Sequence, residues 1–66
     1  MFTRGTVLYV DLGRGQVDVV RIVEVDVQAE TYYTISLKHN NLHGEIYFDQ
    51  DNVHPMPWTA WDTKAT

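Results

Sequence analysis

Three histidines and several carboxylates in the second half of the chain are the side chains best suited to hold a metal ion. The group comprises His39, His43, His54, Glu45, Asp49 and Asp51. Imidazole and carboxylate are ordinary zinc ligands, but the spacing of these residues matches no metal-binding motif. The stretch at 49–51 also lacks the glycine and the closing glutamate of a calcium loop. We therefore expect these side chains to lie in turns or to face solvent, and the sequence predicts no metal ion and no cofactor.

Nucleophilic catalysis would require an activated hydroxyl, thiol or amine beside a base. The chain has no cysteine, and its one serine, Ser36, falls in the middle of an expected strand. Glu24 and Asp26 share one face of another strand, but acid–base carboxylate pairs need a concave site that raises one pKa. The Gly-Arg-Gly stretch at 13–15 indicates a hairpin turn, because a phosphate loop needs a third glycine and a following helix. The sequence thus predicts a protein without catalytic activity.

Aromatic side chains are the better candidates for contact with a partner protein. The expected partner-binding residues are Tyr9, Tyr32, Tyr47, Trp58 and Trp61. The two tryptophans stand three positions apart, beyond the last expected strand. Because exposed indoles are costly in water, the tail either folds back on the domain or presents them to a partner or a second copy.

Two surfaces could receive the tail. Tyr32 and Tyr47 are expected to be diagonal neighbours on the outer face of a hairpin, where they would form an aromatic patch. The strand at 6–12 offers a second, apolar strip, formed by Leu8, Val10 and Leu12. Prolines at 55 and 57 stiffen the exit from the domain, so we expect the indoles to dock on one of these surfaces.

Length and charge narrow the class of partner. A chain of 66 residues is one domain with a small core. Its formal net charge is −4, and its five basic residues are scattered singly, which disfavours free nucleic acid as a partner. No apolar run reaches membrane length, and the first residues do not resemble a signal peptide. The absence of cysteine is typical of a reducing compartment. We expect an intracellular protein, cytoplasmic or nuclear, that binds another protein and no membrane.

The strand that organises the predicted fold covers residues 16–27. Seven of its twelve residues are Val or Ile, whose branched side chains favour a strand over a helix. The alternation of apolar and polar residues slips twice, once between Val19 and Val20 and once between Ile22 and Val23. Phase slips of this kind indicate β-bulges, so we predict one long, bent strand that turns the corner of a small barrel.

The remaining strands are expected at 6–12, 31–38, 44–48 and a short edge around His54 and Pro55. In the strand at 31–38 the alternation places Tyr33, Ile35 and Leu37 inside and the residues between them outside. The turn of this hairpin is expected at 39–42. The predicted core consists of Val7 or Leu8, Val20, Ile22, Val25, Tyr33, Ile35, Leu37, Ile46, Phe48 and Val53.

This layout resembles the Tudor and SH3-like modules of the "Royal" group. The matching stretches are Gly5-Thr6-Val7, VRIVEVD at 20–26, YYTISL at 32–37 and FDQDNVHP at 48–55. The resemblance implies an all-β, five-stranded SH3-like barrel at 1–57 with a tryptophan-containing tail at 58–66. Residues 37–41 stand where Tudor domains carry Phe-x-Asp-Tyr-Gly, so two aromatic walls of the methyl-lysine cage are missing. We therefore expect no useful affinity for methylated peptides, although Tyr9 could replace one wall.

Three functions fit these observations. The first is a non-catalytic protein-interaction module that uses outer aromatic residues. The second is a small acidic inhibitor or decoy, of the type that phages direct against host defence proteins, which would capture a basic, nucleic-acid-binding target. The third is a structural subunit of a homo-oligomer that pairs through its first strand. The sequence leaves all three open.

Overall fold

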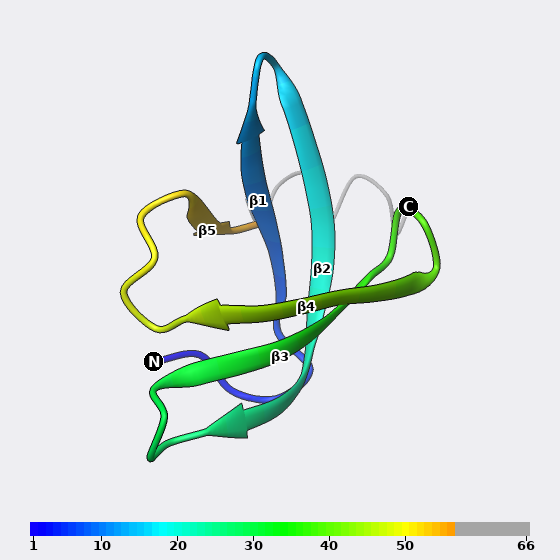
Figure 1. Cartoon of the computed structure of the whole chain (residues 1–66). Coiled ribbons are helices and arrows are strands. Elements are labelled where there is room, and N and C mark those ends of the chain that lie inside the picture. The colour runs from blue at the N-terminus through cyan, green and yellow to red at the C-terminus, as the bar shows by residue number, and fades with distance from the viewer. Residues whose placement is uncertain (57–66) are drawn as a thin grey trace.

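The structure is a computed structural model, which describes residues 1–56. Five antiparallel strands form one sheet in the order β4-β3-β2-β1-β5 (Figure 1). They are β1 (Val7–Gly13), β2 (Gln16–Asp26), β3 (Thr31–Ser36), β4 (Asn41–Tyr47) and β5 (Val53–Pro55). The predicted all-β class is confirmed. Within residues 1–56, hydrogen bonds do not close the sheet into a barrel, since β4 and β5 remain its edges. These residues also form no helix that could cross a membrane.

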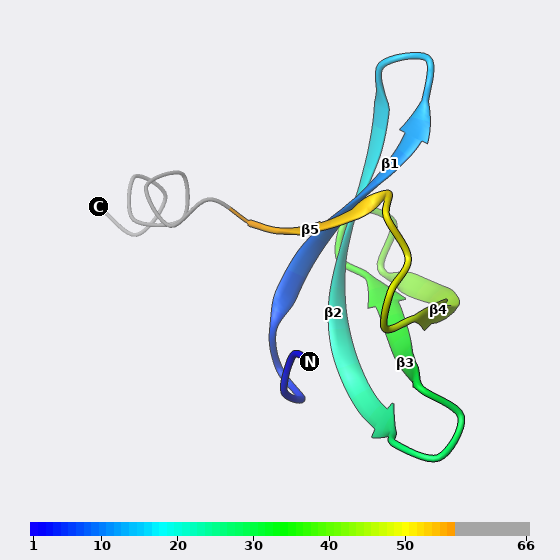
Figure 2. The ribbon, with the colours of Figure 1, turned by 90° about the vertical axis from the view of Figure 1, so that its left-hand side faces the viewer.

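Strand β2 connects the two halves of the sheet. Its first half pairs with β1 and its second half pairs with β3, and the β3–β4 hairpin crosses the β1–β2 hairpin (Figures 1 and 2). The β2–β3 register shifts between Ile22 and Glu24, so Val23 is an extra residue at that point. A bulge of this kind bends a strand and moves the following residues to the opposite face. The predicted slip at Val23 is therefore confirmed.

The second predicted slip, between Val19 and Val20, is wrong. Asp18, Val20 and Ile22 are all buried, so the inward-facing positions continue at period 2 back to an aspartate. The apolar character of Val17 and Val19 suggested an inner face, whereas both lie on the outer side of the sheet and are only half-buried. An ionisable residue thus occupies a position that hydrophobicity alone would give to valine.

The β1–β2 turn is the hairpin that the sequence predicts. Arg14 and Gly15 connect the strands with φ angles of 56° and 75°, the positive values that a tight two-residue turn requires. Asp11 accepts a hydrogen bond from the Gly13 amide at 2.8 Å. This contact supports the register shift that precedes the turn.

The predicted orientation of β3 is wrong. Tyr32, Thr34 and Ser36 are buried, whereas Tyr33 and Leu37 are 39% and 37% exposed and Ile35 is half-buried. The inner face of β3 can carry polar side chains because each of its hydroxyl groups has a hydrogen-bond partner. The Tyr32 hydroxyl accepts from the Phe2 amide at 2.7 Å. The Thr34 hydroxyl donates to the Gly44 carbonyl and the Ser36 hydroxyl donates to the Asp18 carboxylate, both at 2.8 Å.

The β3–β4 turn lies two residues earlier than predicted, at 37–40, with Asn40 at a φ of 56°. Strand β4 then begins at Asn41, and Thr34 lies opposite Gly44. Opposite Ile35 stands Leu42, so His43 is an extra residue in β4. The earlier turn moves the partner of Thr34 back by four positions from the predicted Tyr47, and this second bulge returns it by one, so that Thr34 faces Gly44.

The core is small and lies inside the bend of the sheet. Its buried apolar members are Leu8, Val10, Val20, Ile22, Tyr32 and Ile46, and the half-buried side chains packed against them are Phe2, Val25, Phe48 and Val53. Apart from the three outward-facing residues at 33, 35 and 37, the predicted core residues thus lie in or against the core. Leu12, the end of the expected apolar strip on the first strand, is 55% exposed.

The reversed orientation of β3 predicts unequal effects of two isoleucine truncations. Ile22→Ala removes a fully buried side chain and should lower the free energy of unfolding by about 2–5 kcal/mol. Ile35→Ala acts on the half-buried outer face and should cost less than about 2 kcal/mol. Urea denaturation of both variants measures the difference. Equal losses would show that Ile35 belongs to the core.

Candidate functional site

Tyr9 lies on the outer face of β1, as expected for a contact residue. Its ring packs against the imidazole of His54 on β5, with 5.2 Å between ring centroids and an interplanar angle of 37°. The side chain is half-buried. Trp58 and Trp61, the other residues expected to act with it, lie outside the described residues.

Tyr32 does not lie on the outer face, and its expected exposure is wrong. Only 1% of it is accessible, and its ring lies between Phe2 and Phe48 at centroid distances of 6.0 and 4.6 Å. Its hydroxyl oxygen accepts a hydrogen bond from the Phe2 amide at 2.7 Å. Because both the ring and the hydroxyl have partners inside, Tyr32 anchors the N-terminal segment to the core.

Tyr47 is 64% exposed, and its outward orientation agrees with the prediction. Its aromatic neighbour is Tyr33 instead of Tyr32. Thr31 lies opposite Tyr47 and Tyr33 lies opposite Glu45, so the two tyrosines are diagonal neighbours on the outer face. Sequence reasoning missed Tyr33 because it assigned the wrong face to β3.

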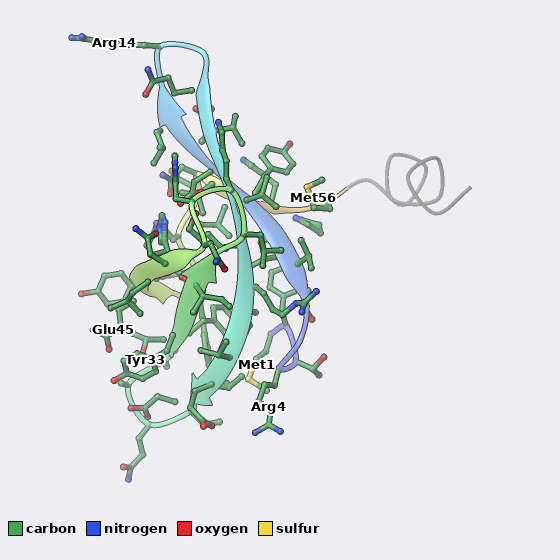
Figure 3. The ribbon with its side chains drawn as sticks, turned by 90° about the vertical axis from the view of Figure 1, so that its right-hand side faces the viewer. Met1, Arg4, Arg14, Tyr33, Glu45 and Met56 are labelled. Atoms are coloured by element: carbon green, nitrogen blue, oxygen red, sulfur yellow. The ribbon has the colours of Figure 1, made fainter. Side chains whose placement is uncertain are left out.

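Carboxylates surround these tyrosines. Glu24 on β2, Tyr33 on β3 and Glu45 on β4 form one row across three adjacent strands, and in Figure 3 Tyr33 and Glu45 point outward from the same region. In the neighbouring row, Asp26 and Tyr47 lie on the two sides of Thr31. We call these five residues the acidic–aromatic surface: Glu24, Asp26, Tyr33, Glu45 and Tyr47.

The charge of this surface acts on the Tyr33 hydroxyl. A hydrogen bond to the Glu45 carboxylate and the negative charge of that group raise the pKa of the Tyr33 hydroxyl, with smaller contributions from desolvation and from Asp26. Glu45 also accepts a hydrogen bond from the Thr31 hydroxyl at 3.3 Å. Within residues 1–56 the one ion pair joins His43 and Asp18, so no basic side chain there neutralises the three carboxylates of the surface.

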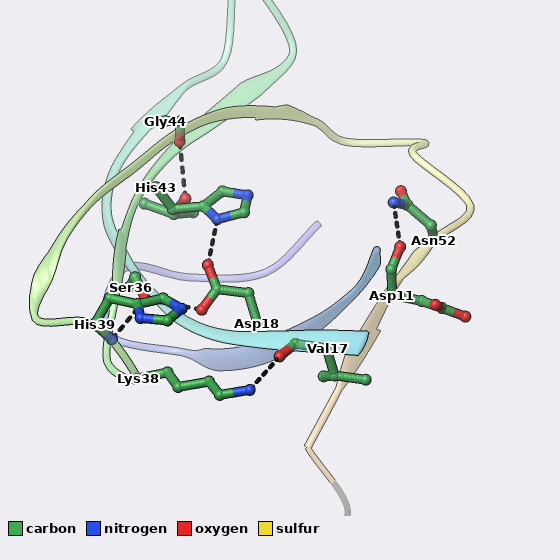
Figure 4. A network of polar contacts seen from close by, with 10 residues as sticks. Asp11, Val17, Asp18, Ser36, Lys38, His39, His43, Gly44 and Asn52 are labelled. Atoms are coloured by element: carbon green, nitrogen blue, oxygen red, sulfur yellow. Dashed lines mark hydrogen bonds and ion pairs between the residues drawn. The ribbon is translucent and has the colours of Figure 1, made fainter. Parts of the chain in front are cut away.

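A second polar group lies inside the fold, where Asp18 joins three strands (Figure 4). Its carboxylate accepts a hydrogen bond from Ser36 of β3 at 2.8 Å and contacts Nδ1 of His43 of β4 at 2.6 Å. An ionised carboxylate can only accept, so Nδ1 carries the proton. The Ser36 oxygen in turn accepts from the His39 amide at 3.0 Å. The β4 bulge turns His43 toward this carboxylate.

The arrangement of these contacts differs from that of a catalytic triad. In a serine-hydrolase triad the histidine stands between the serine and the acid, whereas here Ser36 donates directly to Asp18. Burial by itself raises the pKa of Asp18, but the hydrogen bonds from Ser36 and His43, together with the charges of His43 and His39, outweigh it and lower the pKa overall. The network therefore holds a buried carboxylate in its charged form. Among residues 1–56, no three His, Asp or Glu side chains converge as metal ligands would.

Comparison with known proteins gives no relative, because no protein-family model, curated protein or solved structure matches this chain. The class is therefore defined by the fold alone. It is a small all-β domain whose five-stranded antiparallel sheet is bent like that of a small β-barrel.

The Asp18 network predicts a specific dependence of stability on pH. Because the pKa of Asp18 is lowered in the folded state, its contribution is present above the unfolded value of about 3.9 and is lost as the pH falls further. Asp18→Asn should therefore cost about 1–3 kcal/mol at pH 7, and the difference from the wild type should shrink below pH ~4. Urea unfolding between pH 7 and pH 3 measures it. Asp51→Asn, at an exposed position, is the control, and a difference that stays constant with pH would contradict the assignment.

Proposed function

We propose that this chain is a non-catalytic protein-binding module of SH3/Tudor-like type whose acidic–aromatic surface binds basic side chains of a partner protein. The observation that carries the proposal is the row of Glu24, Tyr33 and Glu45 across three strands. An Arg or Lys side chain placed on the Tyr33 ring would lie between two carboxylates. Ring face and carboxylate attract the same cationic group.

The strengths of these contacts favour a protein ligand over a free cation. A cation–π contact at an exposed site is worth about 0.5–1 kcal/mol, and an exposed ion pair is worth about 0.2–1 kcal/mol. One ring and two carboxylates therefore supply about 1–3 kcal/mol in total, which is too little to hold a single ion at physiological concentration. Such a site gains useful affinity only as part of a larger interface, in which tyrosine is a frequent hot-spot residue.

The sign of the charge supports the same class of ligand. The chain carries a formal net charge of −4, so its field attracts basic surfaces and repels nucleic-acid backbones. The resemblance to Tudor and SH3-like modules adds to this proposal, since those domains bind proteins. A methyl-lysine cage is not part of it: residues 37–40, where the family carries aromatic cage walls, form a turn made of Leu, Lys, His and Asn.

A second candidate function uses the same surface. An acidic inhibitor that covers the basic surface of a nucleic-acid-binding protein would make these contacts too, and the unneutralised carboxylates of the acidic–aromatic surface favour it. The two candidates differ in one outcome. An inhibitor releases a labelled oligonucleotide from its basic partner, whereas an interaction module binds the partner and leaves the oligonucleotide in place.

Removal of two charges tests the proposal. Titration of the chain with a hexa-arginine peptide, followed by NMR, should give saturable shifts at Tyr33, Glu45 and Tyr47 that weaken at high salt. The double variant Glu24→Gln/Glu45→Gln should lose these shifts. Asp49→Asn/Asp51→Asn is the matched control, because it removes the same net charge at exposed positions outside the surface.

If both double variants lose binding equally, net charge alone attracts the peptide and the proposed site is wrong. Loss confined to the Glu24/Glu45 variant supports the site. Circular dichroism of both variants verifies that the fold is unchanged.

A further inference from the structure

The other half of the outer face is mostly apolar, with the exposed Arg21 between Val7 and Ile35 as its charged member on β2. Tyr9 lies opposite Val19, and the Leu37 amide donates to the Val19 carbonyl at 2.7 Å, so these three residues form a row across β1, β2 and the start of the β3–β4 turn. We call the following group the apolar outer surface: Val7, Tyr9, Val17, Val19, Ile35 and Leu37. All are half-buried except Leu37, which is 37% exposed. A contiguous group of apolar side chains on the outside of a sheet is typical of a surface on which another segment docks.

The end of the described chain lies at the edge of this surface. The Met56 amide donates to the Val7 carbonyl at 3.4 Å, so Met56 continues β5 beside the first residue of the apolar outer surface. In Figure 3, Met56 lies next to β1 on the side away from Tyr33 and Glu45. Ten further residues, 57–66, begin there and include Trp58 and Trp61.

We propose that residues 57–66 cover the apolar outer surface and that Trp58 and Trp61 pack on it. An extended chain spans at most about 3.6 Å per residue, so Trp58 can lie about 7 Å and Trp61 about 18 Å from Met56. Neighbouring strands are about 4.8 Å apart, which puts β3 about 14 Å from β5. Both indoles therefore reach this surface without displacing any strand.

The two surfaces that the sequence suggested for the tail are not available in this fold. The expected Tyr32–Tyr47 patch does not exist, because Tyr32 is buried. The expected strip on β1 is also occupied, since Leu8 and Val10 face the core. The acidic–aromatic surface carries three carboxylates and suits a cation better than an indole. Two docked indoles would remove about 300–500 Å² from water, enough to cover a surface of six side chains. This inference does not depend on the proposed function, which uses other residues.

Fluorescence of the full chain tests the inference. Tryptophan emission should be blue-shifted relative to N-acetyl-tryptophanamide, and acrylamide should quench it less. Leu37→Lys places a charge in the apolar outer surface and should shift the emission to the red and increase quenching. Val27→Lys is the matched control, because Val27 is 65% exposed in the β2–β3 connection; it should change neither. Trp58→Phe and Trp61→Phe assign the effect to each indole.

Several results would overturn the inference. Indoles that emit as in water show that the tail is not docked, and protection that Leu37→Lys does not reduce shows that it docks elsewhere. Protection that disappears on dilution shows that a second copy covers the surface. Nuclear Overhauser contacts between an indole and the methyl groups of Val7 or Val19 in the wild type would support the inference directly, because they show that the two groups lie side by side.

Discussion

The fold depends on one constraint: β2 must pair with β1 through its first half and with β3 through its second. A straight strand cannot follow two hairpins that cross, and the bulge at Val23 provides the bend. The bulge also changes which residues face outward. Before it the outer positions of β2 are Val17, Val19 and Arg21, and after it they are Glu24 and Asp26. Apart from Arg21, the bend that encloses the core thus also separates an apolar outer surface from an acidic–aromatic one.

The inner side of the bend contains a polar network beside the small core. Asp18 is 5% exposed, and a carboxylate at that depth is tolerated only when its hydrogen bonds are made. Ser36 and His43 make them, from two other strands. Removing one partner would leave a buried charge, which costs far more than the pair contributes. The network therefore links β2, β3 and β4 in one register, because its three members come from three strands.

The sequence predicts the fold class, the long second strand, the bulge at Val23 and the first hairpin, because each follows from local composition. It fails on β3, where Tyr33, Ile35 and Leu37 form the more apolar of two alternating sets. The inner set is chosen instead by partners distant in the chain, namely the Phe2 amide, the Gly44 carbonyl and Asp18. No local pattern contains that information, and the earlier β3–β4 turn changes the register of β4 as well. Of the expected contact residues, Tyr9 and Tyr47 lie outside as predicted, whereas Tyr33 and the flanking glutamates emerge only once β3 is oriented correctly.

The most direct test of this account is the titration of the Tyr33 hydroxyl, followed by NMR of the ring in the wild type and in Glu45→Gln. Tyr33 titrates as a neighbour of Glu45 only if β3 presents it outward and the β3–β4 register is the one described. The account predicts that the pKa of Tyr33 lies above its ordinary value in the wild type and falls toward that value in the variant. A pKa of Tyr33 that is the same in both proteins, or a Tyr33 ring that titrates only on unfolding, would contradict it.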